Sequence, residues 1–173
     1  MDLSKTSQKD ACNNSRQSII LVVCAGENDI GSGIPLFESE RSFRLLLEAV
    51  LASPGGVISH LIFLGPKIEP WLKDDPDSRK RYIQMSRAFH RQCANAASSN
   101  NNSDTCRAIR ISYIDCLTMF CDDASADQPG ALFGGKAAAD PIFFSSDQLH
   151  LSEKGYVIWK REVENAATKE QES

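Results

Sequence analysis

The chain has no hydrophobic stretch long enough to cross a membrane. Its longest apolar run, Ile19 to Ala25, falls far short of the ~20 residues that a transmembrane helix needs. Residues 1–17 are polar and hold no apolar core of the kind that a secretory signal peptide has. The sequence as given therefore predicts a cytoplasmic protein without a membrane span.

Positive charge, paired cysteines and phosphate-binding loops are also scarce. With 19 Lys and Arg against 23 Asp and Glu, the net charge of −4 predicts no nucleic-acid partner. The six cysteines, at positions 12, 24, 93, 106, 116 and 121, form no paired C-x-x-C pattern, and we interpret most of them as reduced core or surface thiols. No G-x-G-x-x-G occurs, and "GENDIGS" has the glycine spacing of a P-loop without its lysine. We expect no cofactor, and a nucleotide-binding domain is a weak alternative.

What the chain does contain is an alternation of apolar strands and amphipathic helices. The strands are predicted at Ser18–Gly26, Val57–Gly65 and Ile109–Asp115. The helices are predicted at Phe37–Ala52, Asp77–Ala97 and Ser152–Ala167, with Ser152 as a helix N-cap. Continuous apolar strands between helices are typical of a parallel sheet with helices on both faces. The sequence therefore predicts an α/β fold.

The helices are expected to bury one apolar side each. Those sides consist of Phe43, Leu46, Leu47, Val50 and Leu51; of Tyr82, Met85, Phe89, Cys93 and Ala96; and of Tyr156, Trp159, Val163 and Ala167. Loops are predicted at Pro66–Pro76, Ser98–Thr105 and Cys121–Asp140. We expect a disordered lead-in at 1–17, one domain at 18–167 and a tail at 168–173.

Two short polar motifs fall where an open α/β sheet forms its binding crevice, beyond the carboxyl ends of the strands. In the first, Asp147 precedes His150 by three residues, just before the last predicted helix. A carboxylate at that spacing can accept the imidazole Nδ1–H, and the free Nε2 can then deprotonate a hydroxyl. The flanking Leu149 and Leu151 should anchor the turn in the core. Alone, the motif also fits a surface aspartate beside an unrelated histidine.

The second motif, Gly26-Glu27-Asn28-Asp29, ends the first predicted strand. An asparagine there can aim its side-chain N–H at a developing oxyanion. It can equally form an Asx turn that ends the strand. A metal site formed by Asp29, Asp147 and His150 is a further alternative.

Together the two motifs resemble the third and fifth sequence blocks of the SGNH, or GDSL-type, hydrolases. The segments "RYIQMSRAFHRQCA" and "ALFGGKAAADPIFFSSDQLHLSEKGY" extend the resemblance toward the lipase and acylhydrolase members, over most of Ser18–Ala167. The resemblance implies a three-layer, flavodoxin-like sandwich and the hydrolysis of a small-molecule ester. It implies that His150 is the general base and Asp147 its orienting acid. It makes Asn28 an oxyanion-hole donor and Gly26 the small residue at the turn.

The family's nucleophilic serine, in a G-D-S block on the preceding strand, has no counterpart here, and neither does the glycine block that follows it. Only 25 residues precede Gly26, and there is no G-x-S-x-G elbow. Ser32 follows the motif, and Cys24 is expected to be a buried packing thiol. We therefore expect an amino-terminally truncated or inactive form with little or no activity, in which Ser18–Gly26 is an exposed edge open to self-association. A missing amino terminus could also have carried a signal peptide.

The alternative is a non-catalytic binding or scaffold protein on the same fold. The sequence leaves open the ester (a thioester, an acetylated sugar, a short acyl ester or a lysophospholipid) and the oligomeric state.

Overall fold

A computed structural model of the chain describes residues 18–53, 57–101, 109–121 and 139–168. Three strands, β1 (Ile19–Cys24), β2 (Ile58–Leu64) and β3 (Arg110–Ile114), form a sheet in the order β1-β2-β3, and both pairs are parallel. The predicted parallel α/β sheet is thus confirmed. The predicted lead-in at 1–17, most of the tail and most of the loop at Cys121–Asp140 lie outside the described residues.

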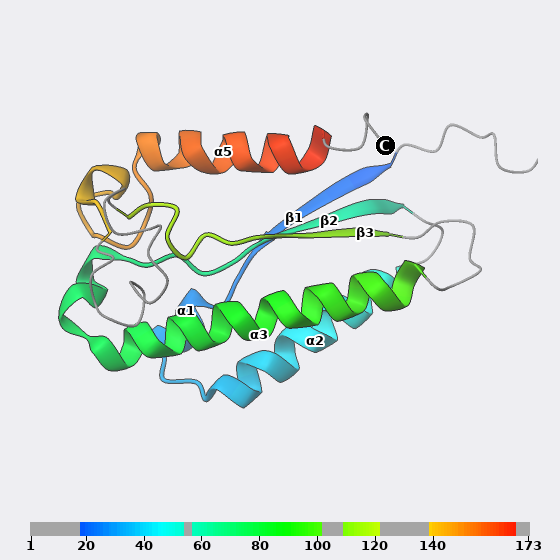
Figure 1. Cartoon of the computed structure of the whole chain (residues 1–173), viewed down its shortest axis with the longest axis horizontal. Helices are drawn as coiled ribbons and strands as arrows, with labels where there is room; N and C mark the ends of the chain where they lie inside the picture. Colours follow the sequence, from blue (N-terminus) through cyan, green and yellow to red (C-terminus); the bar gives the residue numbers. More distant parts are fainter. Residues whose placement is uncertain (1–17, 54–56, 102–108, 122–138, 169–173) are drawn as a thin grey trace, which may run out of the picture.

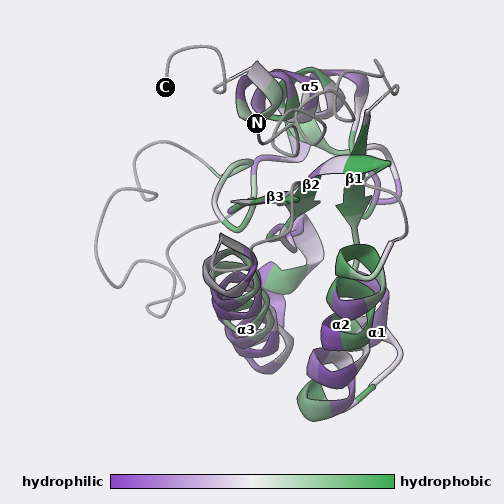
Figure 2. Ribbon diagram, turned by 90° about the vertical axis from the view of Figure 1, so that its right-hand side faces the viewer, coloured by the Kyte–Doolittle hydropathy of each residue, from purple (hydrophilic) through white to green (hydrophobic). Residues whose placement is uncertain are grey.

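Helices cover both faces of this sheet (Figures 1 and 2). The helices α2 (Leu36–Leu51) and α3 (Pro76–Asn101) lie on one face, and α5 (Glu153–Thr168) lies on the other, where it contacts β2 and β3. Short helical turns, α1 (Glu27–Gly31), η3 (Pro70–Asp74) and η4 (Pro141–Phe143), connect them. None of the helices in these ranges combines the length and the apolar character that a membrane span requires.

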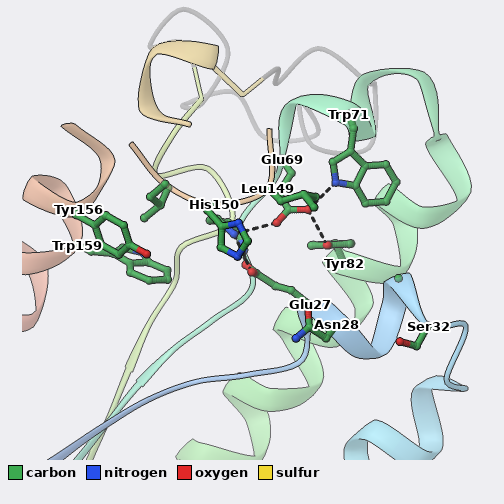
Figure 3. A pocket seen from close by; sticks show the side chains of 13 residues that line it. Glu27, Asn28, Ser32, Glu69, Trp71, Tyr82, Leu149, His150, Tyr156 and Trp159 are labelled. Carbon is green, nitrogen blue, oxygen red and sulfur yellow. Dashed lines mark hydrogen bonds and ion pairs between the residues drawn. The ribbon is translucent and has the colours of Figure 1, made fainter. Parts of the chain in front are cut away.

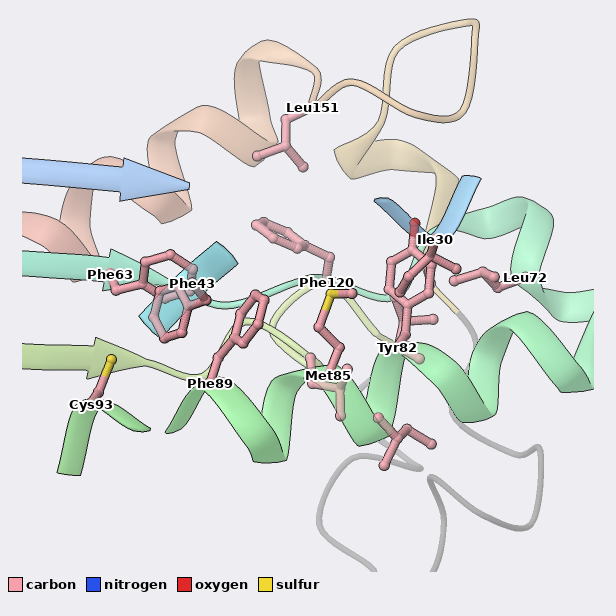
Figure 4. Packing of buried hydrophobic residues seen from close by; sticks show 14 of the residues in the cluster. Ile30, Phe43, Phe63, Leu72, Tyr82, Met85, Phe89, Cys93, Phe120 and Leu151 are labelled. Atoms are coloured by element: carbon pink, nitrogen blue, oxygen red, sulfur yellow. The ribbon is translucent and has the colours of Figure 1, made fainter. Parts of the chain in front are cut away.

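The core between the sheet and the α2–α3 layer is aromatic (Figure 4). Phe43 of α2 lies with its ring centroid 4.5 Å from that of Phe63 on β2 and 4.1 Å from that of Phe89 on α3. Offset and edge-on aromatic pairs of this kind add to the free energy of area burial. The predicted apolar sides of α2 and α3 are therefore confirmed, with their residues buried or partly buried.

Three local predictions were wrong. The helix α3 continues to Asn101 through part of the predicted loop at Ser98–Thr105, and Asn100 Nδ2 donates to the carbonyl of Ile109 at 2.6 Å, which ties its last turn to the residue before β3. The predicted loop at Pro66–Pro76 contains η3, which Pro70 begins in the first-turn position that proline tolerates. The first strand ends at Cys24, two residues before the predicted end at Gly26, because Gly26 is the N-cap of α1.

The predicted apolar side of α5 is confirmed except at Tyr156. Trp159 packs against the core as predicted, Val163 and Ala167 are partly buried, and Ile158 joins them, whereas Tyr156 is 52% exposed. Ser152 precedes the helix as predicted, and its Oγ accepts from the amide of Gly155 at 3.4 Å, a long capping bond. At the other end, Arg110 of β3 donates to the carbonyl of Ala166 at 2.7 Å, which ties the last turn of α5 to the sheet.

The continuous apolar run at Ser18–Gly26 is typical of a strand buried on both faces, and this interpretation was wrong. Strand β1 lies at the edge of the described sheet, and α5 lies over β2 and β3 rather than over β1. Ile20 and Val22 are consequently 45% and 43% exposed, while Leu21 and Val23 pack against the core. Figure 2 shows this hydrophobic strand at the side of the sheet. The predicted apolar edge is present within the described residues.

Candidate functional site

The Asp147–His150 turn has the hydrogen bonds that its sequence predicts. Asp147 Oδ2 accepts from His150 Nδ1 at 2.6 Å. Asp147 Oδ1 accepts from the backbone amides of Leu149 and His150, at 2.9 and 3.0 Å, and from Ser145 Oγ at 2.7 Å. Gln148 has a φ of 60°, the left-handed conformation that this tight turn imposes. Both carboxylate oxygens are therefore engaged, and the imidazole is fixed through Nδ1.

These bonds favour the charged form of the carboxylate. The hydrogen bond from His150, followed by those from the Leu149 amide and from Ser145, holds the pKa of Asp147 well below its usual value. The His150 side chain is 75% exposed, and within the described residues its Nε2 has no hydrogen-bond partner. The Nε2 lone pair can thus receive a proton from a group in the adjoining pocket.

The core anchors this turn through one of the two predicted leucines. Leu151 is 5% exposed and forms an isolated antiparallel bridge with Phe144, which is equally buried. Leu149 was also predicted to be an anchor, but it is 45% exposed and lines the pocket instead. The backbone amide of Ser145 donates to the carbonyl of His150 at 2.8 Å, and this bond joins the two ends of the turn.

Gly26 occupies a position that no other residue fits. Its φ is 108°, and a Cβ there would lie 2.7 Å from Met85 Sδ and 2.8 Å from Phe89 Cε2. The chain turns at this point from β1 into α1, so that Asn28 lies in the first turn of α1 rather than on the strand. Asn28 is exposed, and its side chain has no hydrogen-bond partner in the described part of the chain.

Asn28 and His150 line one pocket of about 510 Å³ at the carboxyl ends of the strands (Figure 3). The two residues lie far apart in the sequence, and Asp147 is bonded to His150 without lining the pocket itself. The aromatic side chains of the pocket come from two directions: Trp71 and Tyr82 on one side, Tyr156 and Trp159 on the other. The predicted convergence in one crevice is thus present for Asn28 and His150, while Asp147 reaches it only through its bond to His150.

The floor of the pocket holds a buried charge network that sequence reasoning missed. Lys67 and Glu69 are 3% and 4% exposed. Lys67 Nζ donates to Glu27 Oε2 at 2.7 Å and to Glu69 Oε1 at 2.9 Å, and the Lys67 amide donates to Glu27 Oε1 at 2.9 Å. Trp71 Nε1 and Tyr82 Oη both donate to Glu69 Oε2, at 2.6 and 3.1 Å.

The network shifts the pKa of its members. Burial raises the pKa of Glu27 more than Lys67 lowers it. Burial alone would lower the pKa of Lys67, but Glu27 and Glu69 together raise it. The sequence did hold a signal for this network. Lys67 and Glu69 come shortly after the predicted strand Val57–Gly65, and charged residues there fall at the same sheet edge as Gly26–Asp29.

Neither residue considered as a substitute nucleophile fits that role. Ser32 lines the pocket, but it lies across it from His150, beyond Asn28 (Figure 3). Cys24 was predicted to be buried and is an exposed residue. Local desolvation, followed by the charge of Glu27, nevertheless raises the pKa of its thiol to about 11, so that little thiolate forms near neutral pH.

The alternative metal site finds no support in the described ranges, where no three His, Cys, Asp or Glu side chains are grouped to hold an ion. Searches against known protein families and against curated proteins found no match to this chain. What the fold and the site define is an α/β protein with a parallel sheet and an Asp–His pair at the carboxyl edge of that sheet.

Proposed function

We propose that this chain carries the base half of an SGNH-type ester hydrolase site, on a flavodoxin-like sandwich, with a small-molecule ester as substrate. The observation that carries the proposal is the 2.6 Å hydrogen bond that His150 Nδ1 donates to Asp147 Oδ2, with His150 also lining the pocket that Asn28 lines. The order of the motifs along the chain and their resemblance to the SGNH blocks add support.

In this proposal His150 Nε2 takes the proton of a hydroxyl nucleophile as the nucleophile attacks the ester carbonyl. Asp147 keeps the proton of the imidazole on Nδ1 and stabilises the imidazolium that forms. The imidazolium then returns a proton to the departing alkoxide. Asn28 Nδ2 donates to the oxygen that becomes negative in the tetrahedral intermediate, a contribution of about 3 kcal/mol for a single donor.

The nucleophile of this reaction is not among the described residues. Ser32 is remote from His150, and Tyr82 Oη is committed to Glu69, with a pKa that burial and then the charge of Glu69 raise. On this proposal the chain alone has little or no turnover, because losing the serine of a triad removes about as much rate as losing the whole triad.

The second candidate is a non-catalytic binding protein on the same fold. The observation in its favour is that, in the described part, no hydroxyl contacts His150 Nε2 although the pocket has aromatic walls. Such a protein would bind a ligand without transforming it.

Turnover of p-nitrophenyl acetate separates the two candidates. A segment with a strand, a G-D-S block and a glycine block is fused ahead of Ser18, and a matched fusion carries alanine in place of that serine. We expect hydrolysis only with the serine, and a loss of about 10²- to 10⁴-fold on Asp147→Asn. A serine fusion that folds yet hydrolyses no faster than its alanine control would support the binding protein.

A further inference from the structure

The Glu27–Lys67–Glu69 network lies between the two parts of the candidate site. Glu27 directly precedes Asn28 on α1, and both of its carboxylate oxygens accept from Lys67, one from the ammonium and one from the backbone amide. These two hydrogen bonds to one carboxylate fix the orientation of the first turn of α1. Asn28 has no side-chain bond of its own in the described residues, so its position depends on the residue before it.

Lys67 also reaches the segment that carries His150. Its ammonium lies over the ring of Phe144, 6.0 Å from the centroid, a distance at which a desolvated cation and an aromatic face still attract. Phe144 forms the bridge with Leu151 at the base of the turn, and Ser145, the next residue, bonds to both Asp147 and His150. One side chain therefore contacts the supports of Asn28 and of His150.

The surroundings of Lys67 explain why it can serve as a rigid link. Glu69 accepts a hydrogen bond from the ammonium of Lys67, and Trp71 and Tyr82 each donate a hydrogen bond to Glu69. A buried charge is tolerated only when its partners are in place, and removing one partner is strongly unfavourable. The network therefore has one well-defined arrangement. Through its contacts it fixes the position of α1 on one side and of the His150 turn on the other.

We propose that Lys67 is a positioning residue that fixes Asn28 relative to His150, through Glu27 on one side and Phe144 on the other. Its consequence for catalysis rests on the proposed ester-hydrolase function. The positioning itself does not, because it concerns the resting protein and can be measured without a substrate.

Native-state hydrogen exchange of the whole chain tests this link. Two groups of amides report on its two ends: Ser32 and Ile34, which bond within and just after α1, and Ser145 and Ser152, which hold the His150 turn. Amides of β2 report global opening. Lys67→Met keeps the length of the side chain and removes its charge. We expect it to accelerate exchange in both groups, roughly fivefold or more beyond any change in β2.

Two further variants keep the test decisive even if Lys67→Met does not fold. Glu27→Gln weakens only the α1 side, so exchange should accelerate at Ser32 and Ile34 and stay unchanged at Ser145 and Ser152. Glu48→Gln, the matched control, removes an exposed ion pair with Arg44 on α2 and should affect neither group.

The proposal is overturned if Lys67→Met raises the exchange rates of both groups only as much as those of β2, if it affects one group alone, or if Glu27→Gln leaves the exchange of the α1 amides unchanged. None of these outcomes bears on ester hydrolysis, which the fusion assay decides separately.

Discussion

At the scale of single residues, the Asp147–His150 pair is the feature that sequence alone predicted best. The spacing of three residues is short enough for one turn to determine the geometry, and four hydrogen bonds to Asp147 make that turn self-supporting. The buried network could not be predicted in the same way. Lys67 and Glu69 follow β2, and Glu27 follows β1, so their contact depends on the pairing of strands that lie 40 residues apart.

Asp147 should remain ionised at a pH where an ordinary aspartate is protonated. Because its pKa is lowered in the folded chain, its contribution to stability is present above the ordinary value near 3.8 and is lost as the pH falls through the lower folded value. Carboxyl ¹³C NMR of the folded protein measures this pKa directly. His150→Ala should raise it most and Ser145→Ala less. An Asp147 that titrates near 3.8 in the unaltered chain would contradict the geometry of the turn.

Gly26 should tolerate no side chain. Gly26→Ala brings a Cβ against Met85 and Phe89 at a positive φ, and we expect it to lower the free energy of unfolding by about 2–4 kcal/mol. Gly33→Ala is the matched control, because Gly33 also has a positive φ, of 74°, but open space around it, and it should cost only about 1 kcal/mol. Urea unfolding measures both. Equal losses would show that the space beside Met85 and Phe89 is not restrictive.

At the scale of elements, continuous apolar runs predicted the strands and a 3.6-residue period predicted the long helices, but both signals failed where neighbouring elements decide. Phe63 is buried by its continuous apolar run, and Phe43 and Phe89 by the 3.6-residue pattern of their helices. An apolar run such as Ile19–Cys24 does not reveal whether other elements cover its strand, so the run alone did not predict the exposure of Val22; only the resemblance to the SGNH hydrolases pointed to an uncovered edge. Likewise, Tyr156 belongs to an apolar stripe by spacing, yet it lines the pocket.

The edge strand β1 should make the chain associate with itself. It carries no charged residue and no proline, the features with which proteins protect such edges. We expect sedimentation velocity to show association that grows with concentration, and Val22→Lys to reduce it by placing a charge on the edge. Leu45→Lys, at a comparably exposed apolar position on α2, should have no such effect. Equal effects of the two variants would mean that β1 is not the contact.

At the scale of the whole molecule, the parallel sheet brings two segments that are far apart in the sequence to one pocket. Asn28 follows the first strand and His150 precedes the last helix, yet both lie at the carboxyl edge of the sheet. The topology predicted from the order of elements is sufficient to explain this meeting. The central claim is chemical: His150, supported by Asp147, can activate a serine that is placed at this edge.

Covalent labelling by a fluorophosphonate tests that claim most directly, because such probes react with a serine only when a base activates it. The G-D-S fusion should be labelled at its grafted serine, as located by mass spectrometry of the peptides. His150→Ala in the same fusion should abolish the labelling, and the unfused chain should remain unlabelled. Labelling that persists in the His150→Ala fusion, or that appears at Ser32 or Cys24 of the unfused chain, would contradict the account.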